Sequence, residues 1–128
     1  MSNNNVKVGL LGVGLSTYWG QFPGLYSRLT DFQSEIERRL ARLHAEVINV
    51  GLIDSSEKAL SAIQKMQAAD VEVVFISILT YSLSSTVLPI IRQLNKTFVL
   101  LNVQPVPAID YTSFNKLADN NTMTGEWL

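Results

Sequence analysis

The stretch VKVGLLGVGLSTYWG, residues 6–20, decides the fold of this chain. Its first half, residues 6–13, is an apolar run broken only by Lys7 and glycines, as expected of a parallel strand that is covered on both faces. Its second half is a turn with glycines, which commonly let a backbone bend closely around a ligand. Because the turn also carries two large rings, Tyr18 and Trp19, it is the first candidate for a binding site.

Strand and helix patterns alternate along the chain after this turn. Apolar residues recur every three or four positions over residues 22–43, which predicts an amphipathic helix of roughly six turns. Pro23 is acceptable in the first turn of this helix, and Gly24 weakens its start, so the helix is expected to be firm only after Gly24. Further strands are predicted at residues 47–53, 71–79 and 97–103.

Two more helices lie between these strands. Asp54 stands three residues before Glu57, the spacing of a capping box, and Ser55 or Ser56 could cap the helix instead. A third helix is opened by serines at 82, 84 and 85, and Pro89 inside it marks either an early turn or a kink.

The alternation of strands and helices predicts right-handed βαβ units and a parallel sheet with helices on both faces. We therefore expect one α/β domain over residues 1–128, a flavodoxin-like three-layer α/β/α fold with strand order 2-1-3-4. After residue 103 the character changes, because Pro105 and Pro107 cannot continue a central strand. Residues 119–126 look like the start of a helix at the chain end, which indicates a piece of a longer protein; a frayed tail is the alternative.

The composition excludes several classes of protein. A net charge of −1 leaves no electrostatic footprint for nucleic acid or an anionic membrane surface. The first residues lack the basic start and apolar run of a signal peptide, and no apolar run approaches the roughly 20 residues that span a bilayer. The absence of cysteine excludes disulfides and thiolate chemistry and fits a cytoplasmic protein.

Ligands of open parallel sheets bind beyond the carboxyl ends of the strands. Four segments meet that rule here: residues 14–19, Asp54, residues 80–82, and Asn102 with Gln104. They supply hydroxyls, amides and aromatic rings with a single carboxylate. Hydroxyls and amides donate to and accept from sugar hydroxyls, and ring faces pack on the apolar patches of a sugar, so this inventory favours a sugar over an anion. Alternatively, Tyr18 and Trp19 merely cover the first helix or fill a subunit interface.

Other ligand and reaction classes fit less well. The sequence GVGLST after the first strand lacks the last glycine of a dinucleotide fingerprint, and the acidic residue that should follow after about 20 residues is missing. Ser16 and Thr17 could hold a flavin phosphate, and neither a P-loop nor the acidic residues of a receiver domain are present. His44 is the only histidine, and the aspartates are scattered, so neither a catalytic triad nor a metal site is predicted.

Three motifs at strand ends together resemble a known family. They are GLSTYWG at residues 14–20, LTYS at residues 79–82 and NVQP at residues 102–105. As an ordered set over the whole chain, they resemble the N-terminal domain of the L-arabinose and L-fucose isomerases. The resemblance implies a flavodoxin-like domain that contacts substrate at the start of a longer aldose–ketose isomerase.

The resemblance also implies which residues touch the substrate. Trp19 matches an aromatic residue of the family's first loop that is usually Tyr, and Gln104 matches a glutamine directly. Ser16 falls where arabinose isomerases have Gln, and Tyr81 falls where they have Phe. With Tyr18, these are the expected substrate-binding residues, and the departures at Ser16 and Trp19 leave the identity of the sugar open.

In such an isomerase, paired glutamates and histidines of later domains hold a divalent metal, usually Mn²⁺, and move the protons. The resemblance therefore implies no catalytic residue, metal ligand or cofactor within residues 1–128, and no isomerase activity from them alone. It also implies a homo-oligomer, a trimer or hexamer, in which this domain reaches the active site of a neighbouring subunit. Two other hypotheses stay open: a stand-alone flavodoxin-like module for a small sugar or flavin phosphate, and a purely structural interaction domain.

Overall fold

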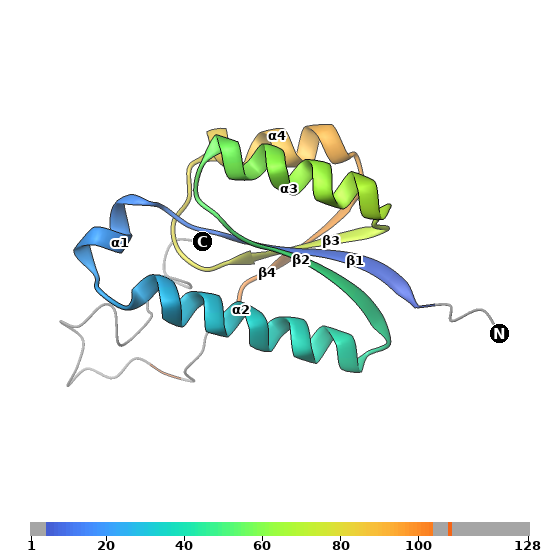
Figure 1. Cartoon of the computed structure of the whole chain (residues 1–128), viewed down its shortest axis with the longest axis horizontal. Helices are drawn as coiled ribbons and strands as arrows, with labels where there is room; N and C mark the ends of the chain where they lie inside the picture. The colour runs from blue at the N-terminus through green and yellow to red at the C-terminus, as the bar shows by residue number, and fades with distance from the viewer. Residues whose placement is uncertain (1–4, 104–107, 109–128) are drawn as a thin grey trace.

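The computed structural model describes residues 5–103 and 108, and it contains one four-stranded parallel sheet. The strand order is β2-β1-β3-β4, which confirms the predicted flavodoxin-like α/β fold (Figure 1). Neighbouring strands pair in parallel throughout. The strands are β1 (Val6–Val13), β2 (Ala45–Ile53), β3 (Val73–Ile78) and β4 (Thr97–Leu101).

Helices cover both faces of this sheet. The helix α2 lies on one face, and α3 and α4 lie side by side on the other (Figure 1). The short helix α1 follows β1 at the carboxyl edge of the sheet and leads into α2 (Figure 1). The bounds of the helices are α1 (Thr17–Gln21), α2 (Leu25–Arg42), α3 (Ser56–Ala69) and α4 (Ser84–Leu94). Among the described helices, none is long and apolar enough to cross a membrane.

The predicted long helix begins directly after Gly24, as its weak start indicated. Gly24 has a φ of 84°, a left-handed conformation that glycine adopts without steric cost. Pro23 therefore lies before α2, so its predicted place in the first turn of that helix is wrong. The break leaves residues 17–21 to form α1, whose Tyr18 and Trp19 pack against the buried residues beneath α2.

The helix starts differ in how they are capped. Ser55 is the N-cap of α3, and its hydroxyl accepts a hydrogen bond from the backbone N–H of Lys58 at 3.2 Å. Asp54 is thus free of a capping role. The N-cap of α4 is Leu83, which supplies no side-chain bond, and Pro89 lies inside this helix.

The core divides into two parts on opposite sides of the sheet. The larger part lies beneath α3 and α4 and includes Leu11, Ile63, Met66, Ile76 and Ile90, all nearly inaccessible to solvent. The smaller part lies beneath α2 and consists of Leu25, Leu29, Leu52 and Leu79. The rings at 18, 19, 22 and 32 pack against this smaller part, which ties the first turn to the core.

A buried polar side chain interrupts the smaller core. Gln33 is only 2% exposed, and its amide N–H donates to Asn49 Oδ1 at 2.9 Å and to the carbonyl of Gly51 at 3.0 Å. The pairing of β1 with β2 shifts at this place, between Leu10 and Gly12. The extra residue of a bulge leaves backbone groups without ladder partners, and the Gln33 amide satisfies one of them.

Candidate functional site

The loops that follow β1 and β3 are joined at the carboxyl edge of the sheet. The backbone N–H of Leu15 donates to Thr80 Oγ1 at 3.1 Å, and the same hydroxyl donates to the carbonyl of Tyr81 at 2.9 Å. The N–H of Thr80 donates in turn to the carbonyl of Val13 at 3.2 Å. Because Thr80 is fully buried, this hydroxyl fixes both loops against each other.

Trp19 is held in the turn by a specific hydrogen bond. Its indole N–H donates to Asp54 Oδ2 at 2.8 Å, so α1 is tied to the end of β2. The edge of its ring meets Tyr26 at a centroid distance of 5.2 Å. A Cβ on Gly14 would lie 3.0 Å from the far end of the same ring, so glycine there lets the indole lie close to the backbone. Trp19 is therefore half-buried and links the turn after β1 to the end of β2.

An ion pair completes this arrangement. Lys58 Nζ lies 2.9 Å from Asp54 Oδ1 and 5.7 Å from the ring centroid of Tyr26. Burial raises the pKa of Asp54, but the hydrogen bonds from Trp19 and Lys58 outweigh it and hold the pKa below its usual value. The hydrogen bond to Asp54 in turn raises the pKa of Lys58. We call Trp19, Asp54, Lys58 and Tyr26 the indole–carboxylate cluster.

This cluster should make the environment of Trp19 depend on pH. Because the folded pKa of Asp54 lies below the unfolded value of about 3.9, its stabilising contribution is complete above that value. It is lost as the pH falls through the lower, folded pKa. In a Trp127→Phe background, where Trp19 is the only tryptophan, we expect its emission to change only below about pH 4. An Asp54→Asn variant should show no such step, and a step near neutral pH would contradict the assignment.

The other predicted site residues lie around the same edge. Ser16 is the N-cap of α1, makes no side-chain capping bond and is exposed. Tyr18 is half-buried and tilted against Phe22 at 6.1 Å between ring centroids. Tyr81, the residue after Thr80, is exposed, and Gln104 lies outside the described residues. The structure thus places Ser16, Tyr18 and Trp19 after β1 and Tyr81 after β3.

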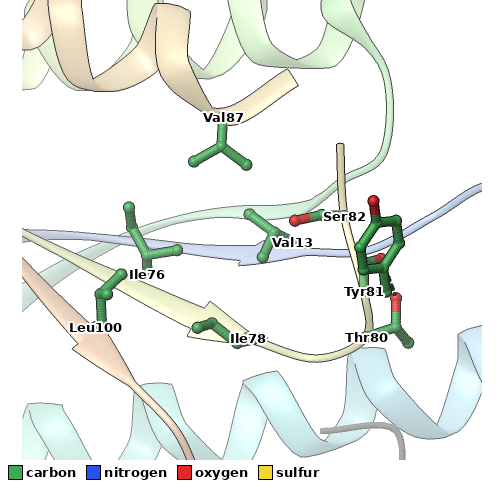
Figure 2. A pocket seen from close by; sticks show the side chains of 8 residues that line it. All are labelled: Val13, Ile76, Ile78, Thr80, Tyr81, Ser82, Val87 and Leu100. Carbon is green, nitrogen blue, oxygen red and sulfur yellow. Dashed lines mark hydrogen bonds between the residues drawn. The ribbon is translucent and has the colours of Figure 1, made fainter. Parts of the chain in front are cut away.

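A pocket of about 210 Å³ opens beside Tyr81 at the carboxyl ends of β1, β3 and β4. Figure 2 shows Val87 of α4 on one side of this space and the strand side chains on the other. The lining is mostly apolar, with three hydroxyl-bearing residues at the loop after β3, and none of the described residues that line it is charged. We call it the edge pocket; it is lined by Val13, Ile76, Ile78, Thr80, Tyr81, Ser82, Val87 and Leu100.

The edge pocket lies where open parallel sheets bind ligands. The chain connects β1 to β2 on one side and β3 to β4 on the other, so the strand order reverses between β1 and β3. An apolar wall with hydroxyls at its mouth can pack against the C–H face of a small ligand and exchange hydrogen bonds with its polar groups. No group of three or more His, Cys, Asp or Glu side chains that could hold a metal ion occurs among the described residues.

Sequence reasoning missed two features of this site. One is the indole–carboxylate cluster, although Asp54 and Lys58 have the i,i+4 spacing of a helical ion pair. The other is the apolar wall of the edge pocket. Val13 and Ile78 line it, but in the sequence they have only the pattern of buried strand residues. In a search of protein-family models, curated proteins and solved structures, no match to this chain was found.

Proposed function

We propose that this domain binds a monosaccharide at the carboxyl edge of its sheet, as the substrate-binding and oligomerisation domain of a metal-dependent aldose–ketose isomerase. In this proposal the divalent metal and the proton-transfer groups are supplied from outside residues 1–128. The domain contributes contacts to the sugar and to neighbouring subunits.

The observation that carries the proposal is the edge pocket. Its volume of about 210 Å³ lies below the roughly 300–1,000 Å³ of sites for drug-sized ligands, so it suits a ligand of a single ring. Tyr81 and Ser82 provide hydroxyls that both donate and accept, as sugar recognition requires. The described residues of the lining carry no charge, which favours a neutral ligand over a phosphate ester.

Binding can be tested by NMR titration of the ¹⁵N-labelled chain with L-arabinose, L-fucose and, for comparison, D-glucose. We expect one sugar to shift the amides of residues 80–82 and 14–16 in a saturable manner. Tyr81→Ala should weaken that binding by roughly tenfold, since it removes a ring contact and a hydrogen bond worth about 1.4 kcal/mol together. Leu60→Ala, on the exposed face of α3, is the matched control and should leave binding unchanged.

Activity provides a second test. With Mn²⁺ and the bound sugar, the purified chain should show no isomerase turnover, because the metal-binding and proton-transfer groups are assigned outside it. Turnover by the chain, purified from a host that lacks sugar isomerases, would contradict this division. Absence of saturable binding by all sugars tested would contradict the sugar site itself.

A flavin phosphate is the second candidate, and the amino end of α4 favours it. Serines at 82, 84 and 85 lie at that end, and the N-cap Leu83 supplies no side-chain acceptor to the first backbone N–H groups. Riboflavin 5′-phosphate is the probe, since binding would quench its fluorescence. Quenching at micromolar flavin without any response to sugars would replace the first proposal by the second.

A further inference from the structure

We propose that two copies of this chain associate through the outer faces of their α4 helices, packed antiparallel about a two-fold axis beside Leu88 and Pro89. This inference rests on the oligomerisation part of the proposed function and deepens it by naming the surface. It does not depend on which ligand the edge pocket binds.

The outer face of α4 carries an exposed apolar centre. Ile90 and Leu94 face the core and are almost fully buried, whereas Leu88 is 42% exposed and Ile91 is 36% exposed. A shallow groove of about 410 Å³ runs over the same face. The groove residues recur at helical spacing along one side of α4: Ser85, Leu88, Pro89, Arg92 and Gln93.

The two ends of this groove carry opposite hydrogen-bonding capacity. Pro89 has no N–H and cannot donate to the carbonyl of Ser85, four residues earlier, so this carbonyl lacks its usual helical donor. At the other end, Arg92 is exposed and forms no salt bridge with another described residue. One end of the groove therefore offers an acceptor, and the other end offers several donors.

A surface with these features complements itself under a two-fold axis. Ser85 lies three residues before Leu88, and Arg92 lies three residues after Pro89. In an antiparallel pair centred between Leu88 and Pro89, the Ser85 carbonyl of each copy lies opposite Arg92 of the partner subunit. The apolar centres then meet each other, which is the residue-to-residue pattern of an isologous interface.

Charge also favours this arrangement over a parallel one. In the antiparallel pair, Arg92 and its symmetry mate are separated by about seven helical residues, or roughly 10 Å along the axis, which is about one Debye length. In a parallel pair the two guanidinium groups would be neighbours.

The absence of cysteine makes the axis directly testable. Helices packed at 8–10 Å with Cα radii of about 2.3 Å bring facing Cα atoms to roughly 3.4–5.4 Å, which overlaps the range for a disulfide. Under mild oxidation, Leu88→Cys should therefore give mainly a covalent dimer. Leu43→Cys, at a site that is 75% exposed after α2, should stay monomeric and is the matched control.

Sedimentation equilibrium of the unmodified chain, without sugar, tests the association itself. A single helix pair gives an interface at the small end of specific interfaces, so we expect a reversible dimer in the range of about 10–500 µM. Leu88→Glu should weaken it at least tenfold, and Arg92→Glu should also weaken it, whereas Leu43→Glu should not. Circular dichroism checks that the variants fold.

Two outcomes overturn the inference: a chain that stays monomeric throughout this concentration range, and a dimer that Leu88→Glu leaves unchanged. Sugar titration of the monomeric Leu88→Glu variant keeps the tests separate. If the chain does not dimerise but the Leu88→Glu variant binds sugar, only the α4 interface is contradicted. If the chain dimerises but binds no sugar, only the sugar site is contradicted.

Discussion

Replacing Gly12 with alanine should lower the free energy of unfolding by about 2–3 kcal/mol, as overpacking of a fixed core does. A Cβ at this position would overlap the side-chain oxygen of Gln33 and a methyl group of Leu79. Neither neighbour can move freely, because Gln33 is held by hydrogen bonds to Asn49 and Gly51, and Leu79 is fully buried. Urea unfolding followed by circular dichroism measures the loss.

Gly20→Ala is the control for this substitution. A Cβ on Gly20 would meet no atom within 4 Å, and alanine favours the helical conformation that Gly20 has in α1. We expect this variant to be as stable as the parent or slightly more stable. If Gly12→Ala also unfolds at the parent's urea midpoint, Gln33 is not fixed as described.

Replacing Asp54 with alanine should cost about 1.5–3 kcal/mol of stability and loosen the turn after β1. The Asp54 side chain is only 7% exposed, so its loss leaves the Trp19 indole N–H and the Lys58 ammonium without their shared acceptor. Part of the cost is offset because Lys58 can reach water. In the Trp127→Phe background, the emission of Trp19 should move to longer wavelength, together with a lower urea midpoint.

Asp31→Ala serves as the matched control, since Asp31 is an exposed aspartate on α2. It should leave both the midpoint and the emission unchanged. Emission of Trp19 that is identical in Asp54→Ala and the parent would contradict the hydrogen bond between Asp54 and the indole. A Lys58→Met variant separates the two partners, because it removes the ion pair and keeps the indole bond.

The main features of the fold could be predicted from local patterns. The run from Val6 to Val13 is apolar on both faces, which only a central parallel strand requires, and the structure places β1 between β2 and β3. The start of α2 could also be predicted, because Gly24 takes a conformation that other residues avoid. Such features depend on a residue and its near neighbours in the sequence.

The candidate site was only partly predictable, because its parts come from separate elements. The rule that ligands lie beyond strand ends located Ser16, Trp19 and Tyr81 at one edge of the sheet. It gave no indication that Trp19 donates to Asp54, 35 residues away, or that Thr80 joins two loops 65 residues apart. These bonds depend on how the strands are ordered and on the angles at which the loops leave them.

The sequence by itself determined the alternation of strands and helices and the parallel sheet, because periodicity and glycine placement act locally. Tertiary structure alone decided which side chains became partners. Gln33 has the sequence pattern of any residue on an amphipathic helix, yet it is buried at a bulge whose backbone needs a donor. Asp54 fits the spacing of a helix cap, yet it binds Trp19 and Lys58, because Ser55 caps α3 and the turn brings the indole within reach.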